Sequence, residues 1–302
     1  MAELMKGQKW SDRYLKGKLR FEFPTTVEEK RDEIRAHFKL VICSDTHKPV
    51  TCKVQSYAGK PLYNLEKQCE QMYAVMLRHG LTELDCGIEV NGNFDDSYRW
   101  VRTKKGVPKG LENAEVVVLL FDLPNFEHTP HATYQYRLGV MQGIIERAGI
   151  PTFKRPLHWV AFDEADIDAM YAQCRRQGTE GVMVKTLTHL YERTRSWAWF
   201  KRKPDETHDG RITGIVEAVC GKDQPELGLH VGDRLARAGA VTVELEDGST
   251  ASPHGIPHAL GRDMFANPEK YIGQWCEFSC MEVDRQGGYR HPIFKRLREE
   301  KA

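Results

Sequence analysis

Two short apolar segments of the chain carry charged residues in a pattern that could bind an anion. Residues 180–185 (EGVMVK) place a carboxylate at one end and a lysine at the other, and residues 199–203 (WFKRK) carry two lysines two positions apart. Successive side chains of a strand point to opposite faces, so Lys201 and Lys203 would share a face. Two lysines directed into one pocket predict an anionic ligand there.

A third charged cluster lies upstream, at residues 28–35 (EEKRDEIR), shortly after the extended segment 21–24. In order and spacing, the three segments resemble the nucleotidyl-transfer motifs of the ATP-dependent DNA ligases, whose first motif reads lysine, any residue, aspartate, glycine. The chain is most similar to the small bacteriophage ligases, and the similarity runs from about Phe21 to Lys301. Any one motif would be weak evidence, whereas five motifs in one order are strong evidence.

The resemblance assigns Lys30 as the nucleophile that attacks the α-phosphorus of ATP. An amine suits this step because the phosphoramidate that it forms is energetic and can release the nucleotide again. A free lysine has a pKa near ~10.4, so Lys30 must be desolvated or surrounded by cations to be neutral at pH 7. We expect four residues to supply this field, to assist catalysis and to bind the triphosphate: Arg35, Lys185, Lys201 and Lys203.

Nucleotidyl transfer also requires a divalent cation, and hard oxygen ligands suit Mg²⁺. Glu180 and Glu89 are the candidate ligands. The resemblance places Glu89, within residues 87–90 (GIEV), at the second carboxylate of the family, although GI stands where aspartate-glycine is usual. A shift of the alignment by a few residues would select Asp85 instead.

In the family, an aromatic face and a carboxylate near the nucleophile bind adenine, and the matching residues here are Phe121 and Glu28. Stacking of a base on an aromatic ring contributes roughly 1–3 kcal/mol. Phe121 ends the apolar run 116–121, so its alternative role is that of a plain core residue. Trp197 and Trp199 lie among basic residues and would extend this site or pack beneath it.

Residues 298–301 (REEK) resemble the last ligase motif, which reads arginine, any residue, aspartate, lysine. The resemblance implies that Arg298 and Lys301 orient pyrophosphate for departure while the second domain closes over ATP, and later contact DNA. The preceding RHP at residues 290–292 favours this interpretation over that of a solvated charged terminus.

Two positions depart from the family pattern. Glu33 replaces the glycine of the first motif, and Tyr57 stands where an arginine usually precedes the Gly59 turn. Glycine would permit a positive φ or close backbone approach, whereas a glutamate in the pocket would repel the triphosphate. We expect the segment to be extended, so that Glu33 faces away from the pocket together with Arg31 and Arg35.

Composition limits the class of protein. With 302 residues the chain can form two domains, and 44 Lys plus Arg nearly cancel 43 Asp plus Glu. A nucleic-acid surface must therefore come from local clusters such as the basic segment 6–20, either a frayed terminus or a strap on DNA phosphates. No apolar run suits a membrane span or a signal peptide, so we expect a cytoplasmic protein, in the host bacterium if it is viral. The eight cysteines form no CxxC pair, which favours reduced thiols over a zinc module.

Periodic apolar positions in the first two thirds of the chain predict helices at about residues 64–79, 138–145 and 167–174, and a strand buried on both faces at 116–121. Strands separated by helices predict a mixed α/β (α+β) nucleotidyltransferase domain over residues 1–207.

After a polar, turn-rich link, the last third of the chain contains short strands at residues 212–220, 241–245 and 275–283, separated by Gly-rich turns. This pattern suits a small all-β barrel over residues 208–302, and the resemblance identifies it as an OB-fold.

The motifs together predict an ATP-dependent DNA ligase that acts as a monomer on nicked double-stranded DNA, with ATP and Mg²⁺. Lys30 would take AMP from ATP and pass it to the 5′-phosphate at a nick, where the 3′-hydroxyl displaces it. The same lysine chemistry leaves RNA ligases and mRNA capping guanylyltransferases as enzymatic alternatives. The two departures leave open a catalytically inactive relative that only binds nucleotides or nicks.

Overall fold

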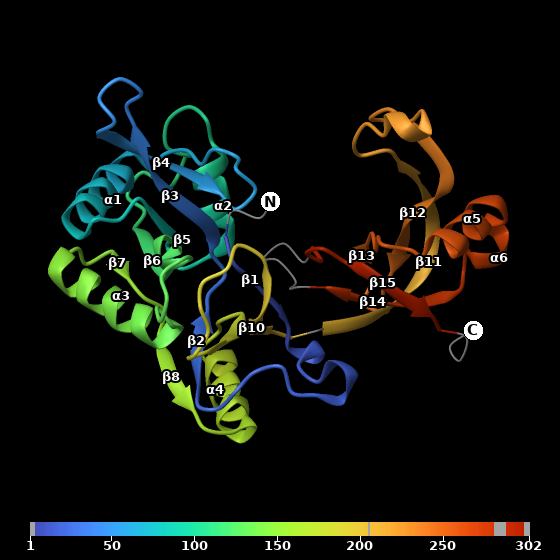
Figure 1. Cartoon of the computed structure of the whole chain (residues 1–302). Coiled ribbons are helices and arrows are strands. Elements are labelled where there is room, and N and C mark those ends of the chain that lie inside the picture. The colour runs from blue at the N-terminus through green and yellow to red at the C-terminus, as the bar shows by residue number, and fades with distance from the viewer. Residues whose placement is uncertain (1–3, 205, 281–287, 299–302) are drawn as a thin grey trace. The chain divides into compact units, whose positions relative to one another are not determined.

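A computed structural model describes residues 4–204, 206–280 and 288–298 of the chain (Figure 1). The chain divides into two compact units, Met1–Lys203 and Pro204–Ala302, a few residues before the boundary expected from the sequence. The first unit has two buried apolar clusters and the second has one. Among the described residues, no helix is long and apolar enough to cross a membrane.

The first unit contains two five-stranded sheets. One has the strand order β4-β3-β5-β6-β7, and the other has the order β1-β10-β9-β2-β8. The strands of the first sheet are β3 (Ile34–Ile42), β4 (Pro49–Ser56), β5 (Glu83–Val90), β6 (Val116–Asp122) and β7 (Phe153–Lys154). Those of the second are β1 (Lys6–Lys9), β2 (Thr25–Lys30), β8 (His158–Ala161), β9 (Gly181–Thr186) and β10 (Arg195–Arg202).

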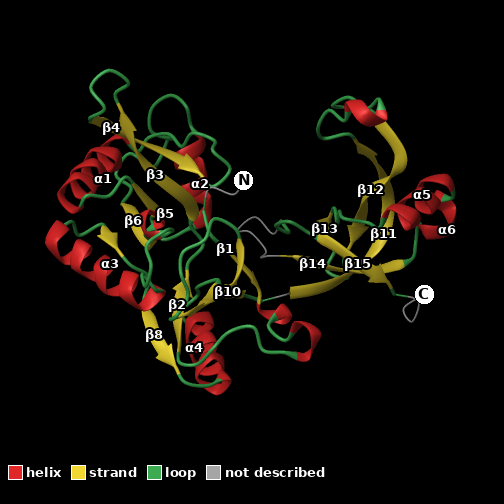
Figure 2. Cartoon of the chain, in the orientation of Figure 1, coloured by secondary structure: helices red, strands yellow, loops and turns green. Residues whose placement is uncertain are grey.

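Four α-helices accompany these sheets: α1 (Glu66–His79), α2 (Phe94–Arg102), α3 (Tyr134–Ala148) and α4 (Glu164–Arg176). The three helices predicted from apolar periodicity are confirmed as α1, α3 and α4. The helix α1 packs on β4 and α3 packs on β6 (Figure 2). The helix α4 packs on β9. Gly80 and Gly149 end α1 and α3 in the left-handed conformation, which glycine adopts without steric cost. Short 3₁₀ turns lie at Trp10–Asp12, Leu15–Gly17 and Pro124–Phe126.

The two sheets meet where the chain passes from β2 to β3. The strand β2 ends at Lys30 and β3 begins at Ile34, so three residues outside either strand connect the sheets. In the second sheet Lys30 lies opposite Gly181, the first residue of β9. A side chain at Gly181 would collide with the carbonyl oxygen of Arg202, so the close approach of these strands requires glycine.

The second unit is built on a sheet with the strand order β13-β12-β11-β14-β15. Its strands are β11 (Glu206–Val219), β12 (Arg234–Glu244), β13 (Thr250–Ala251), β14 (Trp275–Cys280) and β15 (Ile293–Leu297). Two helices, α5 (His258–Ala266) and α6 (Pro268–Tyr271), and a 3₁₀ turn at Pro225–Leu227 were not expected. The helix α5 packs on β12. Within the described residues the strand order has two free ends, so the predicted closed barrel is not confirmed.

Candidate functional site

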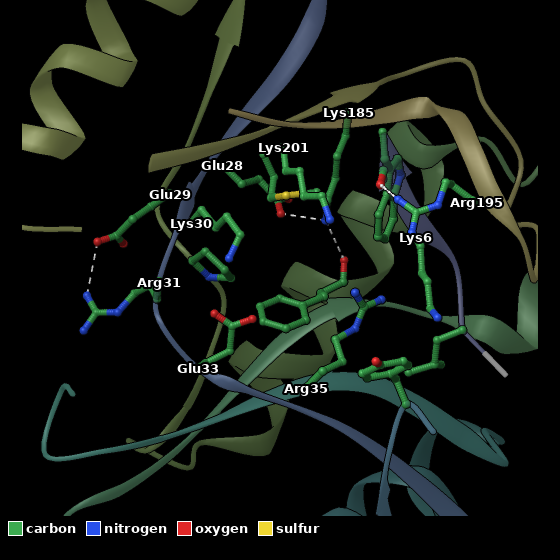
Figure 3. A pocket seen from close by; sticks show the side chains of 17 residues that line it. Lys6, Glu28, Glu29, Lys30, Arg31, Glu33, Arg35, Lys185, Arg195 and Lys201 are labelled. Atoms are coloured by element: carbon green, nitrogen blue, oxygen red, sulfur yellow. Dashed lines mark hydrogen bonds and ion pairs between the residues drawn. The ribbon is translucent and has the colours of Figure 1, made fainter. Parts of the chain in front are cut away.

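A cavity of about 360 Å³ lies in the first unit, and it gathers residues from both sheets (Figure 3). The side chains around it are mainly charged. They come from β1, β2, β9 and β10 of one sheet, from the connection after β2, and from β3 and β6 of the other sheet. The lining residues predicted from the sequence are Glu28, Lys30, Arg35, Phe121, Lys185, Trp199 and Lys201.

Lys30 lies in this cavity at the end of β2 and forms an ion pair with Glu180. Burial lowers the pKa of the Lys30 amine, but the carboxylates of Glu33, Glu180 and Asp32 together raise that pKa above its ordinary value. The expectation that neighbouring cations keep Lys30 neutral is therefore wrong for this arrangement. Without bound nucleotide, the field around Lys30 favours the ammonium form.

Glu180 forms ion pairs with two of the predicted lysines. Lys203 Nζ lies 3.1 Å from Glu180 Oε1, while Lys30 holds the other carboxylate oxygen. Burial raises the pKa of Glu180, but Lys30 and Lys203 lower it overall, so this carboxylate is ionised. Lys203 reaches the site through Glu180 and is not among the residues that line the cavity.

Glu28 and Lys185 lie at the closed end of the cavity in a cluster with almost no solvent contact. Lys185 Nζ is 2.6 Å from Glu28 Oε2 and donates to the Phe121 carbonyl oxygen at 3.1 Å. Arg155 Nη2 donates to Glu28 Oε1 at 2.7 Å, and the Tyr134 hydroxyl donates to the same oxygen. Burial is the main cause that lowers the pKa of Lys185. Arg155 and Tyr134 belong to no motif, so sequence patterns do not predict them here.

Arg35 is fixed by Asp85, which is fully buried on β5. Its Nε and Nη2 donate to the two carboxylate oxygens of Asp85 at 2.7 and 2.5 Å. The guanidinium also lies 5.6 Å from the centre of the Phe121 ring. The sequence offered Asp85 as the alternative metal ligand, but both of its carboxylate oxygens bind and orient Arg35.

Glu89 lies outside the residues that line the cavity and is 5% exposed. Arg31 covers both of its carboxylate oxygens, with Nη2 at 2.6 Å from Oε1 and Nε bound to Oε2. Arg31 also donates to Glu29 at 3.2 Å. Glu89 could reach a cation only after release of Arg31, whereas Glu180 already lies beside Lys30.

Glu33 lines the cavity together with Arg31 and Arg35, so the expectation that these three residues face away from it is wrong (Figure 3). The connection from β2 to β3 is not a strand, so the alternation of faces used for that expectation does not hold there. A Cβ at Gly87 would collide with Glu33 and would lie 2.6 Å from Phe121 Cζ. The departure at Glu33 is thus coupled to the one at Gly87, which stands where the family usually has aspartate, because the missing side chain at Gly87 leaves the space that Glu33 occupies.

Aromatic and apolar residues complete the cavity. Phe121 is only partly buried and lines the space, which goes beyond a plain core role, and Met183 lines it from β9. Trp199 is 1% exposed, and its ring centre lies 4.2 Å from Lys185 Nζ. Trp197 is 38% exposed and is not a lining residue.

Arg298 lies in the second unit, outside the cavity. Its Nε donates to Asp209 Oδ1 at 3.0 Å, and its Nη1 is 3.7 Å from Glu277 Oε2. The other residue predicted from this motif, Lys301, lies outside the described residues.

Residues 89–203 match the ATP dependent DNA ligase domain, a segment that includes Glu180 and the three site lysines after it but not Lys30. The predicted resemblance to the ATP-dependent DNA ligases is confirmed. The chain is 30% identical to the DNA ligase of Escherichia phage T7 over 151 residues, which are 45% of this chain and 42% of that protein. Over 145 residues it is 29% identical to the DNA ligase of Enterobacteria phage T3, covering 45% of this chain and 38% of that protein. These matches span less than half the length of either phage ligase.

Solved ligase structures share the fold over nearly the whole chain. A structure of the Lig E DNA ligases superposes with a TM-score of 0.69 at 18% identity, covering 99% of this chain and 100% of that one. The bacteriophage T7 ATP-dependent DNA ligase in complex with ATP gives a TM-score of 0.51 at 19% identity, with 98% of each chain covered. The mixed α/β fold is thus that of ATP-dependent ligases.

Proposed function

We propose that this chain is an ATP-dependent DNA ligase that seals nicks between a 3′-hydroxyl and a 5′-phosphate in duplex DNA. The observation that carries the proposal is that Lys30 lines a cavity rich in cations within a ligase-like fold and forms an ion pair with Glu180. This cavity combines a primary amine, a carboxylate and binding groups for phosphate and purine. A covalent nucleotidyl transfer needs these groups.

The reaction takes place in three displacements at phosphorus. Lys30 Nζ loses a proton and bonds to the α-phosphorus of ATP, and pyrophosphate leaves with the electrons of the broken P–O bond. An oxygen of the 5′-phosphate then attacks the same phosphorus and breaks the P–N bond. Finally, the 3′-hydroxyl oxygen attacks the 5′-phosphate, and AMP leaves. Positioning and charge neutralisation supply most of the catalysis in such reactions.

The position of each residue in or beside the cavity indicates its role in binding ATP. Phe121 offers a partly exposed ring to the adenine, and Glu28 holds the closed end of the same cavity. Lys201 and Arg35 line the cavity close to Lys30 and would bind phosphate oxygens. Lys185 and Lys203 act through their carboxylate partners, because Glu28 and Glu180 engage them.

A divalent cation would be held by Glu180, whose carboxylate oxygens are ligands that suit Mg²⁺. When bound, the cation would neutralise charge on the α-phosphate and on the leaving pyrophosphate. Glu180 would exchange Lys30 for the cation, which would also remove one of the carboxylates that raise the pKa of that amine. Glu89 is the second ligand only in a state in which Arg31 has moved away.

We assign the second unit as an OB-fold domain. His254 forms single-residue bridges to Ala240 of β12 and to Ile293 of β15, and Phe294 N donates to the His254 carbonyl oxygen at 2.8 Å. These bridges link two strands that are not neighbours in the sheet, as a closing barrel requires. In this assignment, Arg298 and Lys301 contribute to pyrophosphate departure.

The substrate is nicked double-stranded DNA, bound by a monomer through phosphates rather than bases. Such binding is independent of sequence and weakens as salt rises. We place the activity in the cytoplasm, in the host bacterium if the chain is viral.

The test is to incubate the native chain with ATP and Mg²⁺ and to measure its mass before and after addition of a nicked duplex. We expect a mass increase of one AMP, its loss on addition of the nick, and a sealed strand. Transfer to nicked RNA or to a diphosphate RNA end in preference to DNA would favour the other lysine-dependent enzymes. Nick binding without any mass increase would identify an inactive relative.

A further inference from the structure

A closed ring of hydrogen bonds lies behind Arg35. Arg35 Nη2 donates to Asp85 Oδ2 at 2.5 Å and to the Met5 carbonyl oxygen at 2.9 Å. The Tyr191 hydroxyl donates to the same oxygen of Asp85 at 3.3 Å and accepts from Met5 N at 3.1 Å. These bonds therefore form a closed circuit that begins and ends at Arg35.

The ring joins three segments that are distant from one another in the sequence. Arg35 and Asp85 lie on the neighbouring strands β3 and β5. Tyr191 lies in the connection between β9 and β10, and Met5 directly precedes β1. Because β1 pairs with β10 and Met5 is buried, a frayed terminus is excluded for this part of the basic N-terminal segment. The sequence motifs include neither Tyr191 nor Met5, so tertiary packing alone reveals the ring.

Of the four residues in the ring, only Arg35 lines the cavity (Figure 3). The side chain of Arg35 is 23% exposed, whereas Asp85, Met5 and Tyr191 are buried. Burial and the nearby Asp85 carboxylate raise the pKa of the Tyr191 phenol well above its ordinary value, so the hydroxyl keeps its proton and can donate it. A ligand in the cavity would therefore meet Arg35, and the other three residues would act through it.

The position of Tyr191 is itself fixed by contacts with α3. Arg137, which is fully buried on α3, donates to the His189 carbonyl oxygen at 3.2 Å, and Tyr134 N donates to the same oxygen at 2.8 Å. The guanidinium carbon of Arg137 lies 5.7 Å from the centre of the Tyr191 ring, which is close enough for a cation–π interaction. These contacts determine where the Tyr191 hydroxyl lies.

We propose that Tyr191 is a positioning residue for the transfer of AMP to Lys30, because its hydroxyl orients the Asp85 carboxylate that directs Arg35 toward ATP. The proposal rests on the ligase function proposed above, and it adds a residue outside the cavity on which ATP binding depends. A carboxylate bound only to a guanidinium can turn together with it, whereas the bond from Tyr191 fixes the direction of Asp85. A displacement of about 1 Å in such a contact can cost about a hundredfold in activity.

The experiment compares Tyr191→Phe with Tyr73→Phe. Tyr191→Phe removes the hydroxyl that bonds to Asp85 and Met5 and keeps the aromatic ring. Tyr73, on α1, donates its hydroxyl to the Pro49 carbonyl oxygen at 3.0 Å and does not line the cavity. The control variant therefore removes the same group from another part of the first unit. Thermal unfolding midpoints measure the loss of stability in each variant.

The kinetics of AMP labelling separate positioning from stability. We expect Tyr191→Phe to raise the ATP concentration that half-saturates labelling by about tenfold, because a hydrogen bond to a charged group is lost. Tyr73→Phe should leave this concentration within about twofold of the native value. A mere loss of folded protein would lower the rate at saturating ATP and would leave the half-saturating concentration unchanged.

A double-mutant cycle tests whether Tyr191 acts through Arg35. Arg35→Lys keeps the positive charge but loses the planar group that binds both oxygens of Asp85. The measurement is the equilibrium affinity for ATP in a Lys30→Ala background, in which no transfer takes place. Tyr191→Phe should weaken binding by about tenfold when Arg35 is present and by less than about twofold in Arg35→Lys. Asp85→Asn breaks the same ring of hydrogen bonds, so it takes the place of Tyr191→Phe if that variant does not fold.

The proposal is overturned if Tyr191→Phe and Tyr73→Phe give the same half-saturating ATP concentration. It is also overturned if Tyr191→Phe weakens ATP binding as much in Arg35→Lys as it does when Arg35 is present. A failure of the proposed function looks different, because the native chain would then show no AMP labelling at all. The ATP affinities of the Lys30→Ala variants can still be measured in that case, and they would test the link between Tyr191 and Arg35 alone.

Discussion

The cavity has two sides that differ in how their cations are balanced. On the closed side, where the side chains are at most 4% exposed, Lys185 and Arg155 share the buried carboxylate of Glu28. On the open side, Lys6 and Arg195 line the cavity without a carboxylate partner among the described residues. A buried charge is costly unless it is paired, whereas an exposed one remains hydrated.

This difference separates residues that shape the cavity from residues that meet the ligand. A cation that is buried with its carboxylate, as Lys185 is with Glu28, contributes geometry, because its charge is largely cancelled before ATP arrives. An unpaired cation contributes attraction for phosphate. Lys30 lies between the two groups, since Glu180 cancels its charge and must be displaced before the amine can react.

The largest expected effect is at Lys30 itself. Lys30→Ala should abolish AMP labelling and sealing, and Lys30→Arg should fail equally because a guanidinium stays protonated and cannot attack. Lys203→Ala removes the other cation on Glu180 but no nucleophile, so we expect labelling to slow by about 10²-fold and not to disappear. Intact mass after incubation with ATP measures all three variants. Labelled Lys30→Ala protein would place the nucleophile elsewhere.

The next effect tests the closed side of the cavity. Glu28→Ala leaves Lys185 and Arg155 buried without a carboxylate, which should lower the free energy of unfolding by about 3–5 kcal/mol. Arg195→Ala, on the open side, should change it by less than about 0.5 kcal/mol. Denaturant titrations of the two variants give both values. Similar losses in the two variants would contradict the division into paired and unpaired sides.

The sequence predicts the parts of this site that belong to one strand or one motif. Alternation along residues 199–203 places Lys201 on the cavity wall and Lys203 beside Glu180, while Arg202 binds Asp168 elsewhere. The buried strand 116–121 follows from its apolar run and is confirmed as β6. Local periodicity is sufficient for these features because each one depends on neighbours in the chain.

The sequence does not predict the site residues that tertiary packing brings from distant segments of the chain. Arg155 reaches Glu28 from the segment after β7, and Tyr134 reaches it from the first residue of α3, with no shared spacing. Lys6 comes from a strand that composition alone described as a basic terminus. Glu33 was misplaced for another reason, since face alternation was applied to residues that lie between two strands.

The smallest expected effect concerns Glu33 and the pH dependence of labelling. Burial lowers the pKa of Lys30, but the carboxylate of Glu33 is the first of the charges that raise that pKa above its ordinary value. Labelling needs the neutral amine, so its rate should rise with pH up to the raised pKa of Lys30. Glu33→Gln removes this charge while keeping the contact above Gly87, so the pKa of Lys30 falls and the profile moves to lower pH. At pH 7 we expect labelling to become about three- to tenfold faster.

Glu29→Gln is the matched control for this last prediction. Glu29 also lines the cavity, but its carboxylate binds Arg31 and is not among the charges that raise the pKa of Lys30. Its pH profile should therefore stay close to that of the native chain. The measurement is the initial rate of AMP labelling at saturating ATP across the pH range. A slower Glu33→Gln variant with an unshifted profile would mean that Glu33 acts by binding the nucleotide. The glutamate that replaces the family glycine would then contribute to nucleotide binding, and its charge would not control the protonation of Lys30.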